Sequence, residues 1–259
     1  MKRISRRSFT SRPASLGAVV LLALTSASVA AADDGRGPLG VTADAVANRW
    51  SARVGALFPA DRADRAGRPA GGHFCTASVV DSPRGDLLVT AAHCLDGPDR
   101  DLVFVPGYRE GRAPYGVWRV TRRFLPEAWV RDRDEDSDLA FVTVAGRGGR
   151  RVEEVVGGNR FTPGVATGAT VVTVTGYPGS REVPVVCADR PVPWGRTQQR
   201  VDCPDFTTGT SGSPWVNGDH EVVGVLGGHE EGGSTAGTSY SVVLGGAAGE
   251  LYEGAVRGS

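Results

Sequence analysis

Short apolar runs rich in β-branched residues recur along most of the chain, separated by glycine, proline and aspartate. Runs of this length and composition are typical of β-strands. In the first half they lie at residues 53–58, 74–80, 86–92, 102–105, 117–122 and 139–144. In the second half they lie at residues 170–175, 182–188, 198–202, 214–217, 221–226 and 238–243. The spacing predicts two antiparallel β-barrels, over about 53–145 and 162–245, joined by a glycine- and arginine-rich linker.

The end of the chain breaks this pattern. Leu251, Tyr252 and Val256 recur at near-helical spacing within residues 247–256. Apolar residues three or four positions apart lie on one face of a helix. We therefore expect a short C-terminal helix packed against the second barrel.

Residues 1–32 have the pattern of an export signal peptide. A basic head that includes Arg6 and Arg7 precedes an apolar stretch at 16–29 and a small-residue cleavage site at 30–32. The arginine pair also fits a twin-arginine signal, so the Sec and twin-arginine routes both stay open. No later apolar run has spanning length, so we expect a secreted chain without a stable membrane anchor.

The next stretch, residues 33–52, mixes glycine, proline, aspartate and alanine and contains one weak helical patch. We interpret it as a leader or propeptide. The folded domain is expected to begin near Arg53 and to run to residue 259.

Charge and cysteine content limit the kinds of binding partner and the cellular compartment that we expect for this chain. The 259 residues hold 29 basic and 29 acidic side chains, a balance that argues against nucleic acid as a partner. The 4 cysteines of an exported chain predict two disulfides, although the sequence alone allows three pairings. Hairpins would bring Cys75 close to Cys94, and Cys187 close to Cys203.

Three short motifs offer the groups that nucleophilic catalysis needs. The sequence GTSGSP at 209–214 places Ser211 between glycines, where a tight turn can present its hydroxyl beside backbone N–H groups. A serine needs a general base and a group that orients the base. The sequence TAAHC at 90–94 offers His93, and DLAF at 138–141 offers Asp138 at the start of an apolar run. The aspartates just upstream are interpreted as a solvated loop, which lacks the glycine and glutamate of a calcium loop.

These motifs, in the order His, Asp, Ser, resemble the chymotrypsin-like serine peptidases and, within them, the bacterial secreted branch with the nucleophile motif GxSGSP. The resemblance covers the chain from about Arg53 to its end. It implies an all-β fold of two antiparallel six-stranded Greek-key β-barrels packed together, with a short C-terminal α-helix. It also implies a monomeric serine endopeptidase that acts on proteins or peptides. An α/β-hydrolase would need GxSxG, and Ser213 occupies its last glycine position.

The resemblance assigns a role to each residue of the site. Ser211 would attack the scissile carbonyl, His93 would accept its proton, and Asp138 would orient the imidazole. The N–H groups of Gly209 and Ser211 would form the oxyanion hole. This chemistry needs no cofactor or metal.

The cysteine beside the histidine bears on two further expectations. Members of the family usually have a disulfide beside the histidine, and this resemblance favours a bond between Cys75 and Cys94. The competing hypothesis is a zinc site formed by His73, Cys75, His93 and Cys94. The adjacent His93 and Cys94 cannot easily both point at one ion, and export favours oxidation, so the disulfide is preferred.

The specificity pocket is predicted from its position relative to Ser211. Asp205 lies six residues before Ser211, where trypsin-like enzymes place the pocket floor, and this predicts cleavage after Arg or Lys. The alternative is that Asp205 only caps a turn. Leu226, Gly227 and Gly228 would form the pocket wall, and Leu226 stands near the place where glutamate-specific relatives carry a histidine, which disfavours glutamate.

Two other functions stay open at this point. One is a protease-like binding module with little or no turnover, against which the complete triad argues. The other is an esterase-like hydrolase that uses the same triad. Thr210 also replaces the aspartate that captures a new N-terminus in the digestive enzymes, so activation by that ion pair is excluded.

Overall fold

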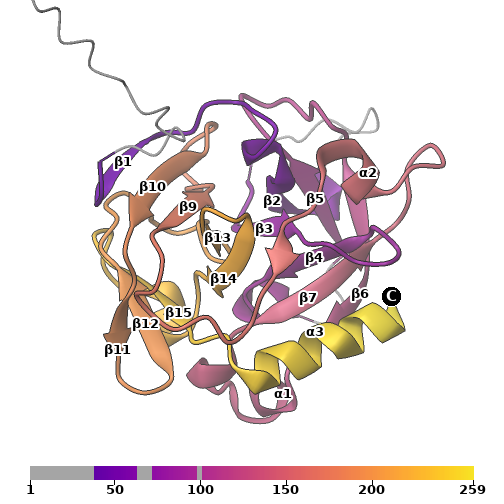
Figure 1. Ribbon diagram of the computed structural model, residues 1–259. Coiled ribbons are helices and arrows are strands. Elements are labelled where there is room, and N and C mark those ends of the chain that lie inside the picture. The colour runs from indigo at the N-terminus through magenta and orange to yellow at the C-terminus, as the bar shows by residue number, and fades with distance from the viewer. Residues whose placement is uncertain (1–37, 63–71, 98–100) are drawn as a thin grey trace, which may run out of the picture. The chain divides into compact units, whose positions relative to one another are not determined.

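The computed structural model describes residues 38–62, 72–97 and 101–259 (Figure 1). The expected signal peptide and the first residues of the expected leader lie outside the described residues. Within the described part of the chain, no helix has both the length and the apolar character needed to cross a membrane.

The first half of the fold is a closed barrel of antiparallel strands. Its order is β2-β3-β4-β7-β6-β5, in which β4 lies beside β7 instead of β5, as in a Greek key. The strands are β2 Val54–Pro59, β3 Cys75–Val79, β4 Leu87–Thr90, β5 Leu102–Pro106, β6 Trp118–Phe124 and β7 Ala140–Val144. The expected first barrel is therefore present.

Alternation along one strand shows how this barrel meets the second half. Successive side chains of a strand point to opposite faces. On β4, Leu88 packs in the barrel core, whereas Leu87 and Val89 pack in a second apolar cluster with Val222 and Val225. Because both faces of β4 are buried, this strand anchors the segment that follows it, which contains His93.

The second half contains a six-stranded sheet and a three-stranded sheet. The order of the larger sheet is β1-β10-β9-β13-β14-β8, and that of the smaller is β11-β12-β15. An isolated bridge between Leu226 and Ser241 links the two sheets. All pairs in them are antiparallel except β14 with β8. The strands are β1 Val41–Asp44, β8 Arg160–Phe161, β9 Val172–Gly176, β10 Val185–Asp189, β11 Val192–Trp194, β12 Gln198–Val201, β13 Pro214–Val216, β14 Glu221–Val225 and β15 Ser239–Val242.

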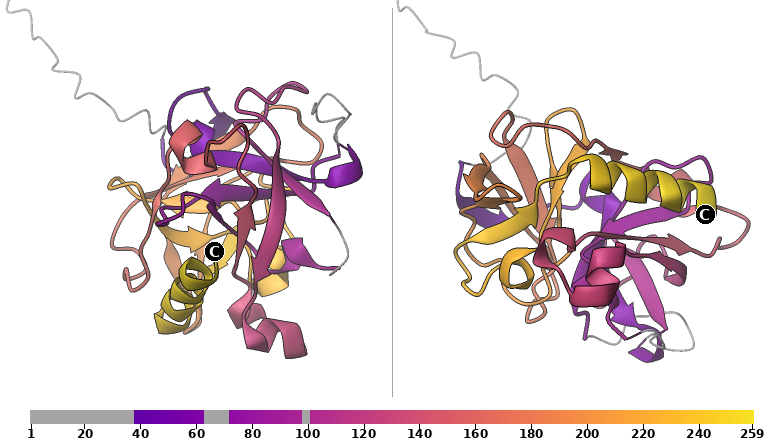
Figure 2. Two further views of the ribbon diagram at one scale, coloured as in Figure 1. Left: turned by 90° about the vertical axis from the view of Figure 1, so that its right-hand side faces the viewer. Right: turned by 90° about the horizontal axis from the view of Figure 1, so that it is seen from below.

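Helices are few and short apart from the last one. They are α1 Glu127–Asp132, α2 Val152–Val156 and α3 Gly246–Gly258, with 3-10 turns η1 Ser51–Arg53, η2 Ala60–Arg62, η3 His93–Leu95, η4 Glu135–Ser137 and η5 His229–Gly232. The expected C-terminal helix is present as α3. We expected it on the second barrel. It lies along β6 and β7 of the first barrel (Figures 1 and 2) and also packs against the second half, in an apolar cluster that includes Val222 and Val225. Tyr252 makes both kinds of contact, since its ring lies against Phe141 of β7 and Phe161 of β8.

The region expected to be a leader contributes to the fold. Strand β1 pairs with β10 in the register Val41 to Ala188 and Asp44 to Val185, and Figure 1 shows the two strands side by side. Ala45, just after β1, and Ala52, which packs in the core of the first barrel, are both buried. The folded unit therefore begins ahead of Arg53, where the sequence interpretation placed its start.

Candidate active site

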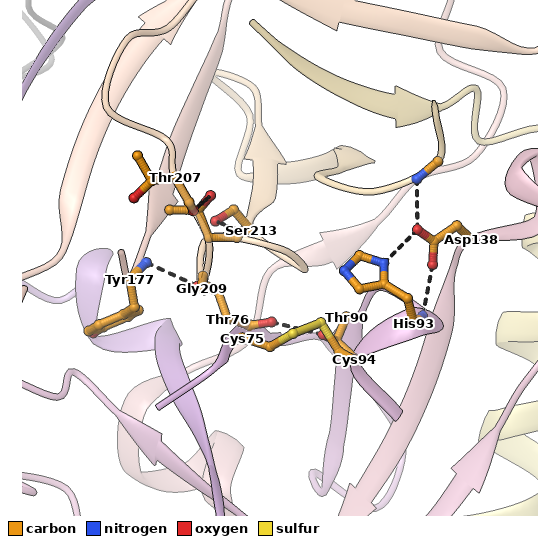
Figure 3. Close-up of a disulfide and its surroundings, with 12 residues drawn as sticks. Cys75, Thr76, Thr90, His93, Cys94, Asp138, Tyr177, Thr207, Gly209 and Ser213 are labelled. Carbon is orange, nitrogen blue, oxygen red and sulfur yellow. Dashed lines mark hydrogen bonds and ion pairs between the residues drawn. A yellow bond between two sulfur atoms is a disulfide. The ribbon is translucent and has the colours of Figure 1, made fainter. Parts of the chain in front are cut away.

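His93 is held just beyond the end of β4 by a short turn and a disulfide. It begins η3, three residues after the end of β4. The next residue, Cys94, forms a disulfide with Cys75, the first residue of β3, as expected. Figure 3 shows this disulfide beside the imidazole ring. The bond therefore ties the histidine turn to a strand that is itself buried in the barrel.

Asp138 engages His93 through both carboxylate oxygens. Its Oδ2 lies 2.7 Å from Nδ1 of His93, and its Oδ1 accepts the backbone N–H of His93 at 3.0 Å (Figure 3). The carboxylate lies between the end of η4 and the start of β7. With Nδ1 donating to Asp138, Nε2 is the nitrogen of His93 that remains to accept a proton.

The surroundings of Asp138 keep its carboxylate buried and hydrogen-bonded. Asp138 is 0 % exposed, and a third donor, the N–H of Gly228, reaches Oδ2 at 2.8 Å. A Cβ atom on Gly227 would lie only 2.8 Å from Oδ2. Glycine at position 227 is therefore what lets the loop after β14 approach the carboxylate so closely.

The pKa of His93 reflects two opposing influences. Burial lowers the pKa, because an imidazolium loses hydration inside the protein. The hydrogen bond and the charge of Asp138 raise it, helped by the charges of Glu231 and Asp96. The second influence is larger, so the pKa of His93 lies above its ordinary value.

Ser211 lies on a rigid turn that is fastened to the first barrel. The N–H of Thr76 donates to the carbonyl of Ser211 at 2.7 Å, and the hydroxyl of Thr76 donates to the carbonyl of Gly209 at 3.0 Å. Gly212 has a φ of 84°, and a Cβ there would lie 2.3 Å from the hydroxyl of Thr90. These contacts place the nucleophile turn, residues 209–214, against the end of β4, just ahead of His93.

The hydroxyl of Ser211 is free to react. In the part of the chain that the structure describes, no hydrogen bond engages its Oγ atom. Catalytic hydrogen bonds are often loose before substrate binds and tighten in the complex.

Two backbone donors beside Ser211 are also left without protein partners. Among the described residues, no group accepts a hydrogen bond from the N–H of Gly209 or of Ser211. Gly209 has a φ of 100°, and a Cβ there would lie 2.6 Å from the nitrogen of Gly179. Only glycine fits this position, and it leaves both N–H groups available to a ligand at the turn.

A cavity of about 380 Å³ opens beside Ser211. Its acidic members are Glu230 and Glu231, both exposed and both with a positive φ, of 50° and 56°. Its lining consists of Phe206, Thr207, Thr208, Thr210, Ser211, Leu226, Glu230, Glu231, Gly232, Gly233, Ser234, Thr235 and Ala236.

The predicted pocket residues separate into two groups. Leu226 lines the cavity, whereas Gly227 and Gly228 lie beside Asp138. Asp205 is exposed, has a φ of 66° and is absent from the cavity lining. The structure therefore does not place Asp205 in the lining of this cavity, which begins at the next residue, Phe206.

The two glutamates were missed by sequence reasoning. Residues 227–233 read as a glycine-rich loop in which Glu230 and Glu231 have no special spacing. The available signal was a pair of acids inside a glycine run that closely follows the nucleophile turn. Their place at the cavity depends on the left-handed backbone of the loop, which the sequence does not display.

The cysteines all form disulfides. Cys187 pairs with Cys203, so both expected pairings are present. Cys75, His93 and Cys94 lie close enough to suggest a metal cluster, but both sulfurs are already bonded to each other. The zinc alternative therefore loses its two thiolate ligands. Two disulfides fit an oxidising compartment outside the cytoplasm.

The fold and this site define a serine hydrolase of the double β-barrel type, and comparison with known proteins gives the family. The sequence matches the model of the trypsin-like peptidase domain over residues 75–225, which is more than half of the chain. The chain belongs to the trypsin-like peptidase family and is a serine endopeptidase with a chymotrypsin-like fold. A search of the curated proteins found no match.

Solved structures of bacterial and other proteases share the fold. Protease Anisep from Arthrobacter nicotinovorans is 25% identical with a TM-score of 0.67, covering 80% of this chain and 96% of that one. The thermostable serine protease AL20 from an extremophilic microorganism is 25% identical with a TM-score of 0.68, covering 82% and 100%. A Glu endopeptidase at 18% identity, with a TM-score of 0.66 and coverage of 86% and 99%, is similar in fold alone.

Proposed function

We propose that this serine endopeptidase is secreted, acts as a monomer and cleaves peptide bonds through a triad of Ser211, His93 and Asp138. The observation that carries the proposal is the contact of 2.7 Å between Nδ1 of His93 and the buried carboxylate of Asp138. A buried carboxylate on Nδ1 is what a histidine base needs in order to present Nε2 to a nucleophile. Ser211 lies on the adjoining turn and is the nucleophile.

Each residue then has one task in the reaction. Nε2 of His93 takes the proton of Ser211 Oγ as that oxygen attacks the carbonyl carbon of the peptide bond. The imidazolium passes the proton to the leaving amine, and an acyl-enzyme on Ser211 remains. Water, deprotonated by the same nitrogen, releases the acid. Asp138 stabilises the imidazolium in both halves of the cycle.

The oxyanion of the tetrahedral intermediate would be bound by the N–H groups of Gly209 and Ser211. Their lack of an acceptor within the described residues supports this role. Such donors stabilise charge that develops only in the transition state, and removal of one typically costs about 100-fold in rate or more.

We further propose that the enzyme prefers Arg or Lys before the cleaved bond. The acidic lining of the cavity beside Ser211 supports this preference, and it comes from Glu230 and Glu231 in place of Asp205. A hydrogen bond with Ser234 lowers the pKa of Glu230, so this carboxylate is charged at neutral pH. A cationic side chain that enters the cavity would meet two carboxylates on one wall.

Removal of the two negative charges tests the preference for Arg or Lys. Peptides that differ only by Arg, Lys, Gln or norleucine before the cut are assayed with the wild type and with the double variant Glu230→Gln and Glu231→Gln. We expect kcat/KM for Arg and Lys to fall toward the values for Gln. Asp205→Asn is the matched control and should leave the ranking unchanged. A wild type without preference for Arg or Lys would overturn the proposal.

The two other candidate functions are separated from an endopeptidase by simple assays. A protease-like binding module would cut no peptide and would give the same result after Ser211→Ala. An esterase-like hydrolase would turn over acyl esters but leave a mixed peptide library intact. We expect peptide cuts by the wild type that disappear in Ser211→Ala.

A further inference from the structure

Gln198 lies at the point where the two halves of the fold meet around Asp138. It is the first residue of β12, and only 6% of it is exposed. Strand β12 belongs to the second half, whereas Asp138 leads into β7 of the first. Gln198 makes no contact with the reacting groups. Its side chain amide instead contacts the two backbone segments that surround the carboxylate of Asp138.

The first contact is with η4, the turn that leads into Asp138. Nε2 of Gln198 donates to the carbonyl of Glu135 at 3.1 Å and to Oδ1 of Asp136 at 2.8 Å. η4 covers Glu135–Ser137, so Asp138 follows it directly. The amide therefore fixes the chain immediately ahead of the carboxylate.

The second contact is with the loop that donates to Asp138. Oε1 of Gln198 accepts the N–H of His229 at 3.4 Å. The preceding residue, Gly228, packs so closely that a Cβ on it would lie 2.4 Å from the same oxygen. Gly228 is also the residue whose N–H reaches Oδ2 of Asp138 at 2.8 Å. The position of this donor thus depends on the amide behind it.

We propose that Gln198 is a positioning residue for the catalytic aspartate, because its single amide locks η4 and the Gly228 loop in the register that aims Asp138 at His93. The inference rests on the proposed triad. An amide suits this role, since it offers a donor and an acceptor on one planar group without adding charge. A carboxylate at this place would face Asp136 and the carbonyl of Glu135 with no proton to donate.

A second tie between the same segments is weaker. The side chain of Glu135 reaches the N–H of Glu230 at 3.2 Å and Nδ1 of His229 at 3.4 Å. Glu135 is exposed, so water and salt screen these contacts. Gln198 is buried, and loss of its partners would leave unsatisfied backbone groups inside the protein.

The neighbouring residue Gln199 provides a matched control. It is as deeply buried, at 4%, and its amide donates to the carbonyl of Val223 at 3.2 Å and accepts from Thr167 at 3.1 Å. Its side chain makes none of the contacts around Asp138. Gln198→Met and Gln199→Met each remove one buried amide from the same strand, so we expect a similar loss of folding stability from both. They differ in that only Gln198 is linked to the segments around Asp138.

The experiment measures kcat and KM over pH for the full-length mature enzyme and both variants. It also follows the imidazole of His93 by NMR titration in a Ser211→Ala background. For Gln198→Met we expect kcat to fall by about 10- to 100-fold with little change in KM, since a small misplacement of a catalytic group is costly. The pKa of His93 should fall toward its ordinary value. For Gln199→Met we expect kcat and the His93 titration of the wild type.

The outcomes separate this inference from the proposed function. Equal kcat losses in both variants, with an unchanged His93 titration, would mean a structural role only and would overturn the inference. If Ser211→Ala still hydrolysed peptides, the triad itself would fail, whereas the NMR titration would still report on the coupling of His93 to Asp138. If Gln198→Met does not fold, Gln198→Glu keeps the shape but not the donor and should show the same loss of kcat. Wild-type behaviour of that variant would contradict the inference.

Discussion

Nδ1 of His93 and Oδ2 of Asp138 are 2.7 Å apart, and the N–H of Gly228 reaches the same carboxylate oxygen from the opposite half of the fold. The pair itself lies within the first half, and one hydrogen bond to its carboxylate crosses the junction of the two halves. Asp138 comes from the first half, and the loop that completes its hydrogen bonding comes from the second. The base of the reaction depends on how the two halves meet.

The raised pKa of His93 predicts the pH at which activity is lost as the solution is acidified. In the proposed triad the histidine must be neutral to accept the proton of Ser211, so its protonation should inactivate the enzyme. Because the pKa lies above the ordinary value of about 6.5, we expect kcat/KM to fall already at a pH above 6.5 as the solution is acidified. A pH profile of peptide hydrolysis measures this acid limb.

Replacement of Asp138 by asparagine tests the cause of that shift. Asp138→Asn removes the charge and the acceptor that fix the tautomer of His93, so kcat should fall by about 10⁴-fold. The remaining activity should titrate at lower pH, because the main influence that raises the pKa of His93 is gone. Asp132→Asn, on the exposed end of α1, is the control. An unchanged acid limb in Asp138→Asn would contradict this explanation.

A methyl group on Gly209 should disable the oxyanion hole. In Gly209→Ala the added Cβ would lie 2.6 Å from the nitrogen of Gly179 and 2.7 Å from the carbonyl oxygen of Tyr177, so the turn must shift. We expect kcat to fall by about 100-fold or more. Gly237→Ala, where a Cβ meets nothing within 4 Å, should keep the wild-type kcat. Thermal unfolding of both variants shows whether the loss is only one of folding.

The motifs of the proposed triad could be recognised in the sequence because each is local. A serine between glycines, a histidine after a buried strand and an aspartate before another strand can each be recognised within a few residues. The strand pattern gave the two-barrel architecture for the same reason. The geometry of the pocket could not be read in this way. Asp205 is exposed with a φ of 66°, and this backbone conformation has no sequence signature at that residue.

The features that were missed depend on contacts between distant segments. Strand β1 is short and partly polar, so only its pairing with β10 identifies it as a strand. Gln198 lies about 60 residues from Asp136 in the chain, and nothing local predicts their hydrogen bond. The pairing of β1 depends on the register of the six-stranded sheet, and the contact of Gln198 depends on how the two halves of the fold meet.

The two disulfides should have different effects on activity. They close loops of similar length, with separations of 19 and 16 residues, so removal of either should cost about 3 kcal/mol of stability. Serine replacement of Cys75 and Cys94 should also lower kcat, because His93 lies on the turn that this bridge holds. Replacement of Cys187 and Cys203 is the control. Denaturant unfolding and kcat of both double variants, measured at a temperature where they stay folded, check this difference.

Strand β1 should be needed by the mature enzyme. Removal of residues 38–45 would expose an edge of β10 and take away the buried side chain of Ala45, so we expect a lower midpoint of thermal unfolding. A purely inhibitory propeptide would have the opposite signature, with unchanged stability and higher activity after its removal. N-terminal sequencing of the enzyme from culture medium gives a direct check. We expect a mature chain that still contains Val41.

Covalent labelling with an organophosphonate that reacts only with activated serines tests the central claim most directly. Labelled protein is digested and the modified residue is located by mass spectrometry, with His93→Ala and Ser211→Ala in parallel. We predict one label per chain on Ser211 in the wild type, and no label in either variant. A label on another serine, or peptide cleavage by a wild type that takes up no label, would contradict the triad.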